Sequence, residues 1–250
     1  MPLSTERTGL LPEQGKQPDV TPLRRHLEGG PASRVGPLDA LREAKRLFQA
    51  GERLDMQSLA AALSVDRATL YRWVGSRERL LTEVLWALEE ETFRRLRAPR
   101  PDGSTSTAAD VIAAAVQASI GNAGLQRFLQ REGDLALKLM TTRSTDFQQR
   151  LIDLIGDVVD ADRRAGRLQD VVPADDLPYV VVRVMESYVY LNLITGADPE
   201  PERAARVLRA LLPCDARASD GPRTADAQQG PPQRPAAEAP AVRSSARTAR

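Results

Sequence analysis

The chain of 250 residues carries 35 Lys and Arg against 34 Asp and Glu, so a net charge of +1 gives no bulk electrostatic argument for nucleic-acid binding. Its single cysteine, Cys214, and single histidine, His26, argue against a disulfide framework, a Cys/His zinc site and a Ser-His-Asp triad. No apolar run reaches the roughly 18 residues that span a bilayer, and the N-terminal residues lack the apolar segment of a signal peptide. We therefore expect a cytoplasmic protein with no membrane partner, metal or cofactor, and not an enzyme.

The composition divides the chain into four parts. Residues 1–36 are rich in Pro, Gly and charge, and residues 214–250 in Ala, Arg, Pro, Gln and Ser, which predicts a disordered arm and a disordered tail. Helical periodicity dominates between them, with no alternating β-branched run, so we expect an all-α fold. The linker APRPDGSTST at 98–107 separates a smaller helical domain, residues 37–98, from a larger helical domain, residues 105–213.

The first domain begins with a predicted helix, PLDALREAKRLFQAG, that ends at Gly51. Asp55 has the right chemistry to cap the next helix, MQSLAAAL, and Asp66 to cap a third, RATLYRWV. Only Ser64 and Val65 separate these two short helices, so they must cross steeply. This spacing predicts a helix-turn-helix motif at about residues 55–74.

The third helix has an inward and an outward face. Leu70 and Val74, four residues apart, point inward, which leaves the helix N-terminus free to reach base edges in a major groove. The residues with suitable chemistry are Arg67 for guanine, Ala68 or Thr69 for the thymine methyl group, and Tyr71, Trp73 and Arg77 for phosphate. The alternative is an amphipathic helix with ordinary surface arginines, in which Trp73 is a half-buried packing residue.

The segment LAAALSVDRATLYRWVGSRERLL resembles the DNA-binding domain of the tetracycline-repressor (TetR) family. The resemblance implies a homodimer that places two recognition helices in successive major grooves of a pseudo-palindromic operator. It implies DNA contacts from Gln57, Arg67, Ala68, Thr69, Tyr71, Trp73 and Arg77. The sequence departs from the family pattern at Ser64, where glycine is usual, at Trp73, where histidine, tyrosine or phenylalanine is usual, and at Arg77, where lysine is usual.

The second domain is predicted to contain helices at Ala108–Ser119, Gly124–Arg131, Leu135–Thr141, Thr145–Ala165, Ala174–Thr195 and Glu202–Leu212. In the Ala174–Thr195 helix, Tyr179, Arg183, Glu186 and Tyr190 fall on one stripe among apolar residues. A charged pair in so apolar a helix must be mutually satisfied. The pair is either a structural Arg183–Glu186 contact, the polar end of a ligand pocket, or part of an interface.

The pocket hypothesis adds three apolar walls, so the predicted ligand-binding residues are Phe128, Met140, Phe147, Tyr179, Arg183, Glu186 and Tyr190. The run REGDLALKLMTT and the later RVMESYVYLNLITG resemble the regulatory domain of regulators of quorum-signal (acyl-homoserine lactone) degradation, the QsdR-like type. That resemblance implies a small lactone-like or acyl effector. The TetR resemblance implies dimerisation through the Ala174–Thr195 and Glu202–Leu212 helices.

Together these features predict a homodimeric transcriptional repressor that a small amphipathic effector releases from its double-stranded DNA operator. Within that class, an activator or a regulator without an effector stays open. A helical protein-interaction module without specific DNA binding is the alternative from a different class.

Overall fold

The computed structural model describes Thr21, Arg24, Leu27, residues 35–169 and residues 171–214. These residues form α-helices and no β-strand, with one isolated bridge between Leu168 and Cys214. The predicted all-α fold is therefore confirmed. Most of the predicted arm at 1–36 and nearly all of the predicted tail at 214–250 lie outside the described residues.

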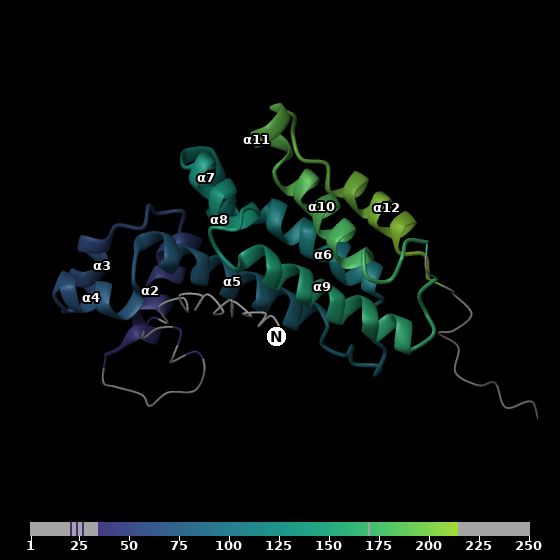
Figure 1. The fold of residues 1–250 in the computed structure, drawn as a ribbon, viewed down its shortest axis with the longest axis horizontal. Helices are drawn as coiled ribbons and strands as arrows, with labels where there is room; N and C mark the ends of the chain where they lie inside the picture. The colour runs from purple at the N-terminus through teal and green to yellow at the C-terminus, as the bar shows by residue number, and fades with distance from the viewer. Residues whose placement is uncertain (1–20, 22–23, 25–26, 28–34, 170, 215–250) are drawn as a thin grey trace, which may run out of the picture. The chain divides into compact units, whose positions relative to one another are not determined.

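Four helices form the first part of the described chain, namely α2 (Pro37–Gln49), α3 (Met56–Ala62), α4 (Arg67–Val74) and α5 (Arg77–Leu96). Their inward faces carry apolar side chains at helical spacing, and Phe48, Leu59, Leu70, Val74 and Leu80 are all buried. Figure 1 shows α3 and α4 beyond one end of the long helix α5, which continues among the later helices.

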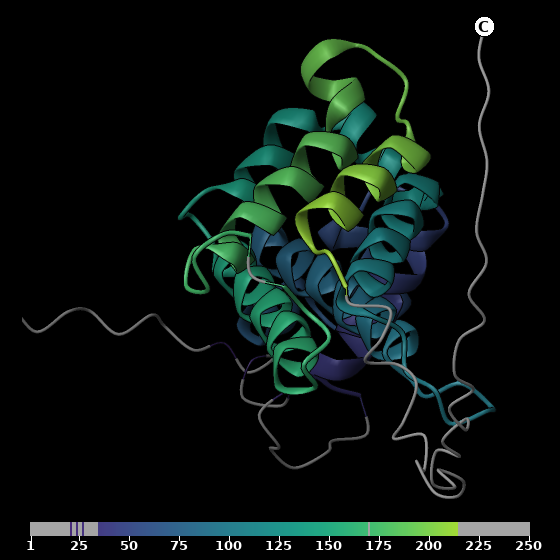
Figure 2. The same ribbon diagram turned by 90° about the vertical axis from the view of Figure 1, so that its right-hand side faces the viewer.

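The remaining helices are α6 (Ala108–Gly121), α7 (Ala123–Arg131), α8 (Gly133–Thr141), α9 (Phe147–Arg164), α10 (Leu177–Val189), α11 (Leu191–Thr195) and α12 (Pro201–Leu211). In Figure 2, α12 packs beside α6 and α10, and α10 packs against α9. The buried carboxylate of Asp162 ties this group together, since it accepts a hydrogen bond from Ala108 N at 2.6 Å and pairs with Arg167 at 2.5 Å.

The single helix predicted at Ala174–Thr195 is wrong in two places. It begins only at Leu177, because Pro178 lacks an N–H and its ring would clash with the Ala174 carbonyl if the helix started earlier. It is also interrupted at Tyr190, where φ −99° and ψ 11° separate α10 from α11. The proposed dimerisation segment therefore consists of two helices.

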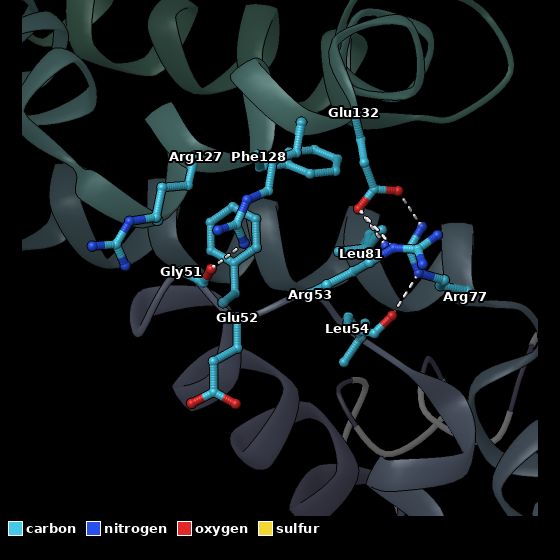
Figure 3. Close-up of a pocket in the computed structure, with 12 residues that line it drawn as sticks. Gly51, Glu52, Arg53, Leu54, Arg77, Leu81, Arg127, Phe128 and Glu132 are labelled. Atoms are coloured by element: carbon cyan, nitrogen blue, oxygen red, sulfur yellow. Dashed lines mark hydrogen bonds and ion pairs between the residues drawn. The ribbon is translucent and has the colours of Figure 1, made fainter.

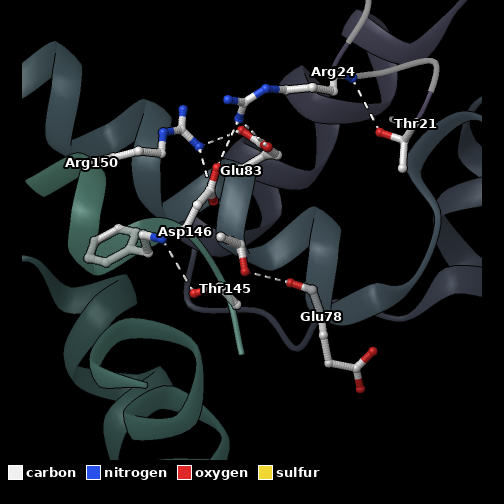
Figure 4. Close-up of polar contacts among 9 residues, drawn as sticks. Thr21, Arg24, Glu78, Glu83, Thr145, Asp146 and Arg150 are labelled. Carbon is white, nitrogen blue, oxygen red and sulfur yellow. Dashed lines mark hydrogen bonds and ion pairs between the residues drawn. The ribbon is translucent and has the colours of Figure 1, made fainter. Parts of the chain in front are cut away.

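Arg24, one of the described residues of the N-terminal segment, contacts the helical body. Its Nη1 lies 3.3 Å from Glu83 on α5 and 3.3 Å from Asp146 at the start of α9 (Figure 4). Glu83 also pairs with Arg150 on α9 at 3.2 Å. These charges join α5 to α9 next to the N-terminal segment.

The described residues contain no single helix with the length and hydropathy to cross a membrane; only α6 and α7 taken together pass that test, and they meet at a bend of 61°. Within the same residues, no group of three or more His, Cys, Asp or Glu side chains is arranged to hold a metal ion.

Candidate nucleic-acid interface and effector cavity

The turn between α3 and α4 has the geometry that a helix-turn-helix requires. Ser64 adopts φ 55°, the left-handed conformation in which glycine is usual, and it is the only non-glycine residue with positive φ in the described chain. The N–H of Val65 donates to the Ala60 carbonyl at 3.0 Å and closes the turn. Serine therefore holds the glycine conformation here.

Two aspartates fix where α3 and α4 begin. Asp55 accepts a hydrogen bond from Ser58 N, and Asp66 accepts one from Thr69 N, each at 2.8 Å. These backbone N–H groups hold the pKa of each carboxyl below its ordinary value. The Thr69 hydroxyl also donates to Asp66 at 2.8 Å. Because the Thr69 hydroxyl is engaged by Asp66, the methyl group is the part of the Thr69 side chain that suits an apolar contact with a base.

The solvent face of the motif carries most of the predicted DNA contacts. Gln57, Arg67, Ala68 and Tyr71 are exposed, whereas Leu70 and Val74 are buried, as their spacing predicts. The Arg67 guanidinium lies 5.7 Å from the centre of the Tyr71 ring, which is a cation–π distance. Trp73 is half-buried and packs against the core. The exposed face therefore places the Arg67 guanidinium beside the Tyr71 ring.

Arg77 is the predicted DNA contact with the most partners inside the protein. Its Nε donates to the Leu54 carbonyl at 2.7 Å, and Nη1 and Nη2 donate to the two oxygens of Glu132 at 2.8 and 2.6 Å. Figure 3 shows this two-pronged ion pair between the start of α5 and the junction of α7 and α8. The phosphate contact of Arg77 stays a prediction, and the structure adds a second role.

The same junction holds the loop between α2 and α3. Arg127 donates to the Ala50 carbonyl at 2.7 Å and Arg131 to the Gly51 carbonyl at 3.0 Å, both from α7. Together with the Arg77–Glu132 pair, these two bonds form what we call the α7 latch. It ties the helix-turn-helix to the C-terminal helices through polar contacts.

Beside the α7 latch, the backbone of α7 lies unusually close to the backbone of α2. A Cβ atom added to Gly124 on α7 would lie 2.2 Å from the Phe48 carbonyl oxygen on α2. Such a distance is impossible without backbone movement, so glycine permits this close approach. The Phe48 ring packs edge-on against Phe128 of α7, with 5.6 Å between ring centres.

A cavity of about 50 Å³ lies where α2, α5, α6, α7, α8 and α9 meet. Its walls include Phe48 from α2, Leu85 and Glu89 from α5, Leu125 from α7, Met140 from α8 and Phe147 from α9. Glu89 is the only charged side chain in the lining, and burial raises its pKa to about 7. Since Phe48 belongs to α2, an occupant would touch the helix that supports the DNA-binding motif.

The structure brings only some of the predicted ligand-binding residues to this cavity. Met140 and Phe147 line it, whereas Phe128 lines a smaller depression beside the α7 latch. The α10 residues Tyr179, Arg183, Glu186 and Tyr190 are not part of its wall. Sequence reasoning missed Glu89, although its position four residues after the buried Leu85 was a readable signal.

The α10 stripe runs from the surface into the interior. Tyr179 is 52% exposed, whereas Glu186 and Tyr190 are buried. Arg183 Nη2 lies 2.7 Å from Glu186 and the guanidinium lies 5.3 Å from the Tyr179 ring, so the intrahelical pair exists as predicted. Gln148 on α9 also donates to Glu186 at 3.3 Å.

Burial dominates the electrostatics of this stripe. It raises the pKa of Glu186 to about 7, with a smaller opposing effect from Arg183. Burial also raises the pKa of Tyr190, and the negative charges of Glu186 and Glu89 add to that shift. Tyr190 therefore lies within electrostatic reach of both carboxylates.

Comparison with known proteins agrees with this architecture. The family model described as the tetracyclin repressor-like C-terminal domain matches residues 104–213. The solved structure of the R. erythropolis transcriptional repressor QsdR from the TetR family is similar, with 28% identity, a TM-score of 0.60, and coverage of 70% of this chain and 93% of that one. Residues 104–213 are therefore identified as a tetracyclin repressor-like C-terminal domain.

A Shewanella sp. PV-4 chain described as a TetR-family transcription regulator shares 16% identity, with a TM-score of 0.39 and coverage of 70% and 97% of the two chains. Curated protein sequences give no significant match. The similarity to a TetR-family transcriptional repressor supports a DNA-binding regulator rather than an enzyme.

Proposed function

We propose that this protein is a homodimeric transcriptional repressor that leaves its operator when a small effector enters the cavity beneath α2. The observation that carries the proposal is Phe48, which lines the cavity and also belongs to the helix that supports α3 and α4. A ligand in contact with Phe48 acts directly on the DNA-binding motif. QsdR, to which the chain is similar over 70% of its length, is itself a repressor.

The proposed DNA interface consists of the exposed face of α3 and α4. Arg67, Ala68 and the Thr69 methyl group read base edges, and Gln57 contacts phosphate or base. Tyr71 and Trp73 hold phosphates, with Arg77 as a further phosphate contact. Dimerisation through α10, α11 and α12 sets the two recognition helices about 34–36 Å apart. Exposed apolar side chains on these helices support that interface, namely Tyr179, Leu193, Ile194 and Val207.

The ligand-binding proposal centres on the cavity. Met140 and Phe147 form its apolar walls. Effector entry favours a dimer whose recognition helices no longer match the operator spacing.

Selection of bound genomic fragments, followed by retention at physiological salt, tests the proposal. The wild-type chain should select a pseudo-palindromic site, and Arg67→Ala should weaken binding by about 1–3 kcal/mol and relax the base preference at one position. Arg143→Ala, an exposed arginine remote from α4 in sequence, is the matched control and should bind like the wild type. No enrichment of any sequence by the wild type favours the protein-interaction module.

A further inference from the structure

In the described part of the chain, the proposed effector cavity is lined by one acidic side chain, Glu89, that no basic side chain pairs with. Glu89 has no hydrogen bond or ion pair within the described residues, and the cavity lining includes no lysine, arginine or histidine. The neighbouring glutamate Glu91 pairs with Lys45, so α5 does supply a paired carboxylate nearby. Glu89 is the acidic side chain of this helix that faces the cavity.

Two other polar side chains around the cavity have local hydrogen-bond partners. The Thr92 hydroxyl donates to the Leu88 carbonyl at 2.9 Å, and the Asn122 side chain accepts from Leu125 N at 3.0 Å. Neither group carries a positive charge that pairs with the Glu89 carboxylate. A carboxylate among apolar walls is stabilised most by a cation brought into contact with it.

We propose that the effector is an organic cation whose ammonium group pairs with Glu89 and whose apolar part packs on Phe48, Met140 and Phe147. This proposal rests on the proposed function and specifies the ligand of the same cavity. The acyl or lactone effector implied by sequence resemblance has no positive charge for this carboxylate.

The cavity selects an alkylammonium group over a metal ion. Hard cations such as Ca²⁺ need six to eight oxygen ligands, and Mg²⁺ needs six. The wall offers one unengaged carboxylate, while its other side chains are mainly apolar. An ammonium group carrying a short alkyl chain satisfies both the charge and the apolar surface.

The volume limits the part of the ligand that this cavity holds. About 50 Å³ leaves room for roughly three or four water-sized groups. A head group of that size fits without rearrangement, and a longer chain must move the walls. Since Phe48 of α2 forms part of that wall, a longer alkyl chain would move α2, the helix against which the DNA-binding motif packs.

Calorimetric titration of the full chain with n-propylammonium, 1-propanol, propionate and K⁺ tests the proposal with probes of the right size. Propylammonium should bind the wild type at least tenfold more tightly than 1-propanol, its neutral equivalent with the same number of heavy atoms. Glu89→Gln should remove that preference, and Glu90→Gln, the exposed neighbour, should keep it. Circular dichroism of both variants confirms that they fold.

Three outcomes overturn the proposal: equal binding of propylammonium and 1-propanol, tighter binding of propionate or K⁺, or an unchanged preference in Glu89→Gln. DNA retention by the same wild-type sample separates this proposal from the function. Loss of cation preference with specific DNA binding intact overturns the effector chemistry alone. Cation binding by a chain that selects no DNA overturns the repressor function instead.

Discussion

The Arg77–Glu132 pair should contribute measurably to stability, and Glu132→Gln is the change that tests it. Two charge-assisted hydrogen bonds of 2.6 and 2.8 Å join the side chains, and each side chain is 18% exposed. A hydrogen bond to a charged group contributes about 1.5–3 kcal/mol, and partial exposure screens part of that. We therefore expect Glu132→Gln to lower the free energy of unfolding by about 2–3 kcal/mol.

A double-mutant cycle isolates the pair from other effects of each substitution. Urea unfolding of the wild type, Glu132→Gln, Arg77→Met and the double variant should give a coupling energy of about 2 kcal/mol. Protein concentration must be equal throughout, because the stability of a dimer depends on it. The exposed pair Arg203–Glu200, with side chains 59% and 57% exposed, is the control and should show a coupling near zero.

DNA binding by the same variants separates the two roles of Arg77. If the pair with Glu132 is its main role, Arg77→Met leaves the slope of log K against log salt unchanged. If Arg77 neutralises a phosphate, that slope falls by about 1. A coupling energy below about 0.5 kcal/mol, together with the lower slope, refutes the structural reasoning and favours the phosphate contact.

Three further predictions follow from local geometry. Gly124→Ala forces a Cβ atom against the Phe48 carbonyl and should lower the free energy of unfolding by about 1–3 kcal/mol. Gly121→Ala is the control and should not destabilise the protein, because no atom lies within 4 Å of the added Cβ; thermal unfolding measures both variants. Burial raises the pKa of Glu89 from its ordinary value of 4.5 to about 7, so the protein loses stability as the pH rises from about 4.5 through about 7 and this carboxyl ionises. Glu89→Gln should therefore raise the free energy of unfolding by up to about 3 kcal/mol at pH 8 and leave it unchanged at pH 4, as measured by urea unfolding at both pH values. Ser64→Val should destabilise by more than 1 kcal/mol while Ser64→Gly should not, because φ 55° strains a β-branched residue; equal midpoints in chemical unfolding contradict this.

The helix-turn-helix could be predicted from sequence because each determinant is local. Asp55 and Asp66 cap their own helices, and Leu70 and Val74 repeat at the spacing of one helical turn. Ser64 stands where the family usually has glycine, and it adopts the left-handed turn conformation without help from distant residues. Nothing distant in the chain was needed to place these residues.

The cavity could not be predicted in the same way, because its wall joins six helices from distant parts of the sequence. Glu89 stands within the run Glu-Glu-Glu at 89–91, which by composition indicates a solvated surface. Only the packing of α5 decides that Glu89 faces inward while Glu90 is exposed. The α10 stripe was predicted to line the pocket because its charged pair lies among valines. In the structure Arg183 and Glu186 pair with each other, and the stripe lies outside the cavity wall.

Arg77 illustrates the same difference within one residue. Its place at the start of α5 indicates phosphate binding, since helix N-termini offer free N–H groups. Its partner Glu132 lies 55 residues away in sequence, and no local sequence pattern predicts that contact. Local chemistry thus gave one role for Arg77, and tertiary packing supplied another.

Helix α5 joins the proposed ligand contact to the DNA-binding motif by its own length. Arg77 in the α7 latch and Glu89 in the cavity are twelve residues apart on one uninterrupted helix, a separation of about 18 Å. In the proposed mechanism, a cation that pairs with Glu89 would act on α5 as a unit, because backbone hydrogen bonds keep such a helix stiff. The Arg77–Glu132 pair resists that movement, so breaking the pair should lower the effector concentration needed for release from DNA. Titrating operator release in Glu132→Gln and the wild type therefore tests whether the latch opposes the switch.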